Sequence, residues 1–181
     1  MEYEWIRSSR RTISLQITSD GRVLVRCPRE MTKGEIDAFV QSKEGWIRRH
    51  LAIGRDSAPA PALTREQLVQ LTEQARQAVT QRVRYFAPLV GVSCGRIAIR
   101  AQRSRWGSCS SKGNLNFNCL LMLVPETVLD YVVVHELCHL KELNHSPRFW
   151  AEVERILPDY KIRRAWLKEQ GGSLIARLPQ K

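Results

Sequence analysis

An α+β fold is predicted by three features of the sequence. Residues 12–27 and 97–121 contain short runs in which apolar and polar side chains alternate, a pattern typical of strands. Between and after these runs, apolar residues recur with the period of an α-helix. The helical pattern at residues 125–143 is apolar on most of its sides, so we expect this helix to be central and buried.

A β-hairpin is expected near the N-terminus. Apolar residues alternate along residues 13–17 and again along residues 23–27, and Asp20-Gly21 between them is a common turn pair. An earlier strand is expected to begin near Tyr3.

Two helices and a linker are expected next. Thr32 opens a capping-box pattern, and the apolar stripe that follows predicts one helix as far as Leu51. Residues 55–63 are rich in Pro and Ala and read as a linker. The second helix is predicted to begin at Thr64 and to be stopped by Pro88.

The second half of the chain is predicted to hold a small sheet and three helices. A strand near residues 97–101 precedes a hairpin formed by residues 103–109 and 114–121. The predicted helices cover residues 125–143, 147–158 and 159–171, the last one being stopped by Gly171-Gly172.

The expected organisation is a single compact structural unit with three parts. Residues 1–55 form an N-terminal hairpin and helix that pack on the core, residues 64–172 form that core, and residues 173–181 form a frayed tail. A chain of 181 residues is long enough to bury one such core.

Charge and cysteine content restrict the classes of protein. Lys and Arg number 29 against 18 Asp and Glu, which gives a net charge of +11 and favours anionic partners, nucleic acid among them. The basic residues are dispersed, so a generally basic surface explains them equally well. The five cysteines include no Cys-x-x-Cys pair, no signal peptide is recognisable and no apolar run is long enough to span a membrane. We therefore expect a cytoplasmic protein that has no disulfide framework and no membrane contact.

The run His135-Glu136-Leu137-Cys138-His139 carries the clearest chemical signal. Residues four apart on a helix share one face, so two imidazoles can bind the same metal ion. Glu136 lies about 100° further around the helix, where its carboxylate can reach a water molecule on that ion. Zinc makes such a water acidic and the carboxylate removes its proton, so Glu136 is the predicted general base. Cys138 is expected to pack in the core.

A catalytic zinc ion usually has three protein ligands, and His145 is the best candidate for the third. It follows His139 by six residues, about 240° around a continuous helix, so the helix must end first. We expect Asn144 to adopt the left-handed conformation that ends the helix, and Ser146-Pro147 to start the next one. If the third ligand is a carboxylate instead, the candidates are Glu142, Glu152 and Glu154.

At these residues the chain resembles the YgjP-like metal-dependent hydrolases, which are akin to SprT-type and minimal gluzincin proteases. The resemblance is strongest from about residue 97 to residue 170. Its motifs are RSRWGSC (103–109), NFN (116–118), HELCHL (135–140), NHS (144–146) and FW (149–150).

This resemblance implies a zincin-like core, with a small sheet, the metal-binding helix and a following ligand helix. It implies that His135, His139 and His145 bind one zinc ion, although other divalent metals suit imidazole as well, and that Glu136 is the catalytic base. The family is commonly described as metallopeptidases, yet one member is described as a UTP pyrophosphatase.

Further residues are predicted around the metal. In zincins a strand beside the active helix commonly lines the substrate cleft, and residues 114–121 are expected to be that strand, with Asn118 hydrogen-bonding the substrate. Arg103 and Arg105 are candidates for pairing with a substrate carboxylate or phosphate. Trp106 and Trp150 are expected to pack rather than to bind a base.

Three functions remain open from the sequence. The leading one is hydrolysis of a peptide amide by a metal-activated water molecule. The second is hydrolysis of a nucleoside triphosphate such as UTP at the same site; the charge favours it, but the chain lacks a Gly-rich phosphate loop. The third is a DNA-associated protease or binding module, although no recognition-helix pattern is present. The sequence does not predict an oligomeric state.

Overall fold

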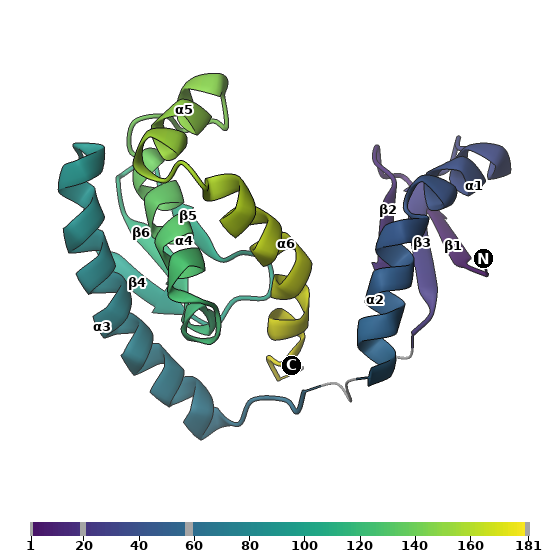
Figure 1. The fold of residues 1–181 in the computed structure, drawn as a ribbon, viewed down its shortest axis with the longest axis horizontal. Coiled ribbons are helices and arrows are strands. Elements are labelled where there is room, and N and C mark those ends of the chain that lie inside the picture. Colours follow the sequence, from purple (N-terminus) through teal and green to yellow (C-terminus); the bar gives the residue numbers. More distant parts are fainter. Residues whose placement is uncertain (1, 19–20, 57–59, 180–181) are drawn as a thin grey trace. The chain divides into compact units, whose positions relative to one another are not determined.

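The chain divides into two compact units, Met1–Ala60 and Pro61–Lys181 (Figure 1). The computed structural model describes residues 2–18, 21–56 and 60–179, with the backbone alone for residues 49 and 52–56. Outside the described residues lie Asp20 of the predicted turn, residues 57–59 of the predicted linker and the last two residues of the predicted tail. The predicted domain limits remain predictions. Within the described part of the chain, every helix is too short or too polar to cross a membrane.

The first unit contains a three-stranded sheet in the order β1-β3-β2. The hairpin is confirmed, because β2 pairs antiparallel with β3, Leu15 lying opposite Val25. The predicted earlier strand is also confirmed and pairs parallel with β3 on its other side. The strands are β1 (Glu4–Ser8), β2 (Ser14–Ile17) and β3 (Val23–Pro28).

The single helix predicted after the hairpin is wrong, because the structure has two helices there, α1 (Lys33–Ser42) and α2 (Glu44–Asp56). The capping box of Thr32 is confirmed. The break falls at Lys43, whose N–H bonds the carbonyl of Val40 at 3.0 Å and so tightens the last turn of α1. The unit has its own apolar core, formed by Val23, Val25, Cys27, Ile36, Val40 and Ile47.

The second unit begins with α3 (Arg65–Val90), which starts at the predicted capping box of Thr64. The predicted stop at Pro88 is wrong, since the helix continues for two more residues. A proline in the last turn removes one helical hydrogen bond but leaves the rest of the turn intact. Gly91 ends the helix instead, in the left-handed conformation with φ 79° that glycine adopts without strain.

The sheet of the second unit has the order β4-β6-β5, with β6 parallel to β4 and antiparallel to β5. The predicted strand 114–121 is shorter than expected, because its last residues belong to a 3₁₀ helix, η1. Asn118 begins this turn by accepting a hydrogen bond from Leu120 N at 3.1 Å. The elements are β4 (Ile97–Arg100), β5 (Gly107–Cys109), β6 (Leu115–Asn118) and η1 (Cys119–Leu123).

Three helices complete the second unit: α4 (Glu126–Cys138), α5 (Pro147–Ile156) and α6 (Tyr160–Ala176). The predicted extension of α4 to residue 143 is wrong, because its last helical residue is Cys138. The predicted stop of the last helix at Gly171-Gly172 is also wrong, since α6 runs through both glycines.

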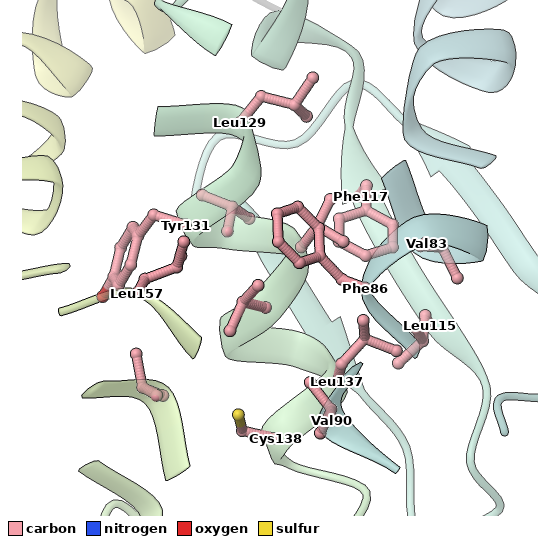
Figure 2. Packing of buried hydrophobic residues seen from close by; sticks show 14 of the residues in the cluster. Val83, Phe86, Val90, Leu115, Phe117, Leu129, Tyr131, Leu137, Cys138 and Leu157 are labelled. Atoms are coloured by element: carbon pink, nitrogen blue, oxygen red, sulfur yellow. The ribbon is translucent and has the colours of Figure 1, made fainter. Parts of the chain in front are cut away.

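Helix α4 is the central buried element, as its apolar sequence predicts. It contacts α3 on one side, α6 on the other and strand β5 (Figure 1). Leu137 and Cys138 from α4 lie with Phe86 of α3 and Phe117 of β6 in one continuous core (Figure 2). Cys138 is fully buried, which confirms its predicted packing role. The α+β class is confirmed, and α4 carries the His-Glu-x-x-His motif within a rigid core.

Candidate metal centre

Three histidines of the second unit converge at the end of α4. His135 lies in its last turn, His139 is its C-cap residue, and His145 lies in the loop before α5. One ring nitrogen from each lies within 4.8 Å of those of the other two, and the Nε2 atoms of His135 and His145 are 3.0 Å apart. The three predicted ligands are therefore brought together, with the third on a loop rather than on the following helix.

The chain returns to the site through a turn that differs from the predicted one. After Cys138 the chain forms tight turns, in which Leu140 N bonds Leu137 O and Glu142 N bonds Cys138 O, both at 3.0 Å. The predicted left-handed conformation of Asn144 is wrong, because no non-glycine residue in the described ranges has a positive φ. The tight turns already end the helix, so no left-handed residue is needed.

This turn also orients His139. The carbonyl of Glu142 lies 3.0 Å from Nδ1 of His139, so this nitrogen donates a proton and the lone pair stays on Nε2. Imidazoles that bind metals are usually held by such a hydrogen bond to their second nitrogen.

Phe149, in the first turn of α5, packs against all three imidazoles. Its ring centroid lies 4.9 Å from that of His135, 4.5 Å from that of His139 and 4.8 Å from that of His145. Trp150 stacks on His145 at 5.5 Å, so its predicted packing role is confirmed, but the packing partner is the site itself. The sequence contains Phe149-Trp150 as a motif, yet no local pattern shows that it faces the histidines.

Glu136 is the buried carboxylate of the site. Its side chain is only 4% exposed, and its Oε2 atom has no hydrogen-bond partner in the described protein. Burial raises the pKa of Glu136 to about 8, and the nearby positive charge of Arg105 opposes this rise. A divalent cation beside the carboxylate would favour its charged form by direct attraction.

Strand β5 leaves room for this carboxylate at Gly107. A Cβ atom at Gly107 would lie 2.5 Å from Oε1 and 2.7 Å from Cγ of Glu136, closer than such atoms approach in proteins. The sequence interpretation missed Gly107, although it lies within the 103–109 motif. Only the pairing of β5 beside α4 shows why a side chain is absent there.

Two of the histidines, His135 and His145, have pKa values that favour the neutral imidazole. Burial lowers the pKa of His135 to about 3, with the nearby His139, His145 and Arg164 adding to this effect. The pKa of His145 is lowered as well, mainly by burial. The rings of His135 and His145 are therefore uncharged near neutral pH, which leaves a lone pair on each available for a metal ion.

The geometry fits a small divalent cation. Ligand nitrogens about 2.0–2.1 Å from a tetrahedral zinc ion lie roughly 3.3 Å from one another, close to the observed 3.0 Å separation of two Nε2 atoms. The alternative carboxylate ligands are not part of the group: Glu152 pairs with Lys141 and Arg155, and Glu154 pairs with Lys161.

The site opens into a cavity of about 470 Å³. Strand β5 and the preceding loop form one wall, so the strand that lines the cleft is β5 rather than the predicted 114–121. Arg105 is exposed and lines this cavity, as expected for a residue near the substrate. The other lining residues are Ser104, Gly107, Ser108, Cys109, His135, Glu136, His139, Leu143 and His145.

Asn118 is buried and hydrogen-bonds the loop before β5. Its side chain is 1% exposed, and its Nδ2 donates hydrogen bonds to the carbonyls of Gln102 and Arg105 at 2.6 and 3.0 Å. These bonds hold the loop before β5 in place and disfavour the predicted direct substrate contact. Arg103 lies away from the histidines, in a neighbouring cleft, where its guanidinium binds backbone carbonyls near the C-terminus.

An α+β domain in which a His-Glu-x-x-His helix and one further histidine gather around a buried carboxylate defines the class of metal-dependent hydrolases. The family described as "YgjP-like, metallopeptidase domain" matches residues 11–71 and 56–170 of the chain. The chain therefore belongs to the YgjP-like metallopeptidase domain family and is a hydrolase that depends on a divalent metal.

Two solved structures are similar to part of the chain. The metallopeptidase zymogen of Pyrococcus abyssi abylysin is 26% identical, with a TM-score of 0.45, over 50% of this chain and 93% of its own. The metallopeptidase zymogen of Methanocaldococcus jannaschii jannalysin is 21% identical, with a TM-score of 0.41, over 48% of this chain and 93% of its own. The search of curated proteins gave no significant match.

Proposed function

We propose that the chain is a zinc-dependent peptidase in which His135, His139 and His145 hold one zinc ion and Glu136 is the general base. The observation that carries this proposal is the convergence of three imidazoles beside a buried carboxylate with an unpartnered oxygen. A zinc ion bound there would polarise the scissile carbonyl and increase the acidity of a water molecule.

In this proposal Glu136 transfers the proton during the reaction. The Oε2 atom of Glu136 accepts the proton of the attacking water and later delivers it to the leaving amine. Gly107 allows the carboxylate to lie against β5, and Phe149 fixes the planes of the imidazoles. The site thereby holds its reacting groups in place before a substrate arrives.

A single substitution tests the role of Glu136. In Glu136→Gln the side chain keeps its size but loses its basicity, so we expect turnover of casein or unstructured peptides to fall by about 100-fold or more. Zinc content, measured by mass spectrometry of the metal, should stay at one ion per chain. The matched control is Glu142→Gln, since the carbonyl rather than the side chain of Glu142 contacts His139. Normal turnover by Glu136→Gln would refute the role.

Hydrolysis of a nucleoside triphosphate such as UTP is a second candidate function. It is favoured by Arg105 at the mouth of the site, because a guanidinium binds phosphate oxygens in a bidentate manner. Release of phosphate or pyrophosphate from UTP, measured beside casein cleavage with Glu136→Gln as the control for both, separates the two functions. UTP turnover without peptide cleavage would replace the peptidase proposal.

A further inference from the structure

A second, larger cleft continues from the metal site along the sheet. Its volume is about 730 Å³, and it shares Ser104, Arg105 and Ser108 with the cavity around the histidines. A ligand that extends from the reacting centre can therefore enter this cleft without leaving the surface. We call it the arginine cleft, because Arg100, Arg103 and Arg105 line it.

The positive charges of the arginine cleft are not neutralised by carboxylates in its lining. The lining contains no Asp or Glu, and the sequence has none between Glu73 and Glu126. Nearby acidic residues of the unit are engaged elsewhere, for example Glu126 and Asp130 with Arg82. The exposed Arg100 and Arg105 form no ion pair among the described residues. The lining of the cleft is therefore positively charged, and Glu136, which interacts with Arg105, belongs to the adjoining cavity around the histidines.

Arg103 is held in a fixed position within the cleft. Its Nη2 atom donates to the carbonyl of Leu178 at 2.5 Å and to the carbonyl of Pro179. Both partners also line the cleft. A guanidinium carries five N–H groups, so the groups on Nε and Nη1 remain for a ligand, and an anchored guanidinium loses little entropy when it binds one.

Arg105 links the arginine cleft to the chemistry. It lines both cavities, and its charge acts on Glu136. An anion bound by Arg105 therefore lies within a few residues of a bond positioned at the histidines. The neutral polar groups of Ser108 and Asn116, which share a hydrogen bond of 3.4 Å, supply further donors beside it.

From this geometry we infer that the arginine cleft binds an acidic segment of the polypeptide substrate, with Arg105 and Arg100 selecting Asp or Glu side chains close to the scissile bond. This inference rests on the proposed peptidase function and adds the substrate class to it. A carboxylate matches the two parallel N–H groups of a guanidinium, and such charge-assisted hydrogen bonds are the strong ones.

The lining of the cleft favours a carboxylate over a nucleotide. Proteins commonly hold nucleoside triphosphates together with magnesium, which requires at least one or two carboxylates near the phosphates. The arginine cleft has none. Because the cleft adjoins the metal site, it suits an extended peptide, whose side chains can reach Arg100 at the end of β4 and Arg103 and Arg105 in the loop before β5.

The test measures binding rather than turnover. Zinc-loaded Glu136→Gln protein is titrated with three fluorescent peptides of equal length, in which glutamate, glutamine or lysine alternates with alanine and glycine. We expect the glutamate peptide to bind about tenfold more tightly than the glutamine peptide and the lysine peptide to bind most weakly. Adding Arg105→Gln or Arg100→Gln should remove most of this preference, and Arg105→Lys should restore part of it.

Arg84→Gln is the matched control, because it removes the same charge from an exposed position on α3 outside the cleft. The inference is overturned if the glutamate and glutamine peptides bind equally, or if Arg84→Gln weakens the preference as much as Arg105→Gln. It is also overturned if UTP or a single-stranded oligonucleotide displaces the fluorescent glutamate peptide at a lower concentration than the unlabelled glutamate peptide does.

Cleavage of the same peptides by the wild-type protein separates this inference from the proposed function. Cleavage without any preference for glutamate would contradict the acidic subsite and leave the peptidase intact. A preference in binding without cleavage of any peptide, casein included, would contradict the peptidase.

Discussion

At the scale of single residues, the position of the Glu136 carboxylate depends on the missing side chain of Gly107. Glu136 is nearly inaccessible to solvent, and its Oε1 atom lies only 2.5 Å from the position that a Cβ of residue 107 would take. The proposed general base is therefore positioned by the backbone of β5, which in turn is held by its pairing with β6. Proton transfer is sensitive to such positioning because the donor and acceptor must stay within hydrogen-bond reach.

Gly107→Ala is expected to lower turnover by about 100-fold, because the added methyl group must push Glu136 away from its position. Bound zinc should remain, since the three atoms nearest to the added methyl group belong to Glu136 rather than to a histidine. The measurement is turnover together with metal content. Gly172→Ala is the control, because a Cβ there meets nothing within 4 Å. Turnover within a few-fold of wild type in Gly107→Ala would show that Glu136 is not held in this way.

The sequence was sufficient for some site residues and not for others. The positions of His135, Glu136 and His139 follow from helical spacing alone, because neighbours on one helix turn are fixed by local geometry. Gly107 and Phe149 reach the site from other elements, so only the tertiary structure reveals them. The substrate contact predicted for Asn118 is disfavoured by the structure for a related reason.

Strand alternation separates the two faces of a strand but does not show whether either face is exposed. Strand β6 is the central strand of its sheet, and three of its four residues are buried. The polar face that the sequence predicted for substrate binding is therefore partly enclosed, and Asn118 satisfies its hydrogen bonds within the protein.

At the scale of secondary-structure elements, Arg82 joins α3 to α4 through ion pairs with Glu126 and Asp130, of which the pair with Asp130 is the more buried. Arg82 donates to both carboxylate oxygens of Asp130, with distances of 2.5 and 2.6 Å. The side chain of Asp130 is only 11% exposed and that of Arg82 is 24% exposed. This bidentate pair fixes the register of α3 against the helix that carries His135 and Glu136.

Arg82→Met is expected to destabilise the protein by about 2–3 kcal/mol, because it leaves the carboxylate of Asp130 buried without its partner. Urea unfolding followed by circular dichroism measures the change. Arg76→Met is the matched variant on the same helix; Arg76 pairs with Glu73 at the surface, so its loss should cost less than about 1 kcal/mol. Equal effects of the two substitutions would show that the buried ion pair contributes no more to stability than the surface ion pair.

The ends of helices illustrate why element boundaries were only partly predictable. Thr32 and Thr64 begin helices where predicted, since a capping box involves only nearby residues. Gly171 and Gly172 did not end α6, because tertiary packing overrides the weak helix propensity of glycine. The indole of Trp106 lies directly against Gly171, where it leaves no room for a side chain.

Replacing each of these adjacent glycines by alanine tests that explanation. A Cβ at Gly171 would meet Trp106 Cζ2 at 3.0 Å and Nε1 at 3.1 Å, so overpacking should outweigh the gain in helix propensity. A Cβ at Gly172 meets nothing, so Gly172→Ala should stabilise by about 0.5–1 kcal/mol. We expect Gly171→Ala to be less stable than Gly172→Ala by about 1–3 kcal/mol in urea unfolding. If Gly171→Ala were more stable than Gly172→Ala, the proposed packing role of Gly171 would be contradicted.

At the scale of the whole molecule, each compact unit has its own apolar core, and all three histidines of the candidate metal centre lie within the second unit. Family membership, the α+β class and the three histidines of the candidate site were all accessible from the sequence, because motif spacing and apolar periodicity are local. The division of the described chain into two cores was not, because it depends on which distant apolar residues meet. The site lowers the stability of the folded state, because His135 Nδ1 and Glu136 Oε2 are buried without hydrogen-bond partners among the described residues.

A bound metal ion should offset this cost. An ion that binds only the folded state at about 100 times its dissociation constant stabilises that state by about 2.7 kcal/mol, so zinc should raise the melting temperature by about 10 °C. Differential scanning calorimetry with zinc and with a chelator measures this shift, and restored zinc should reverse the effect of the chelator. In His145→Ala the shift should become much smaller, because two ligands bind zinc more weakly than three. His50→Ala is the control, since His50 stacks on Trp46 in the first unit and should leave the shift unchanged. The proposed zinc site of three histidines would be contradicted if zinc did not change the melting temperature of the wild-type protein, or if His145→Ala showed the full shift.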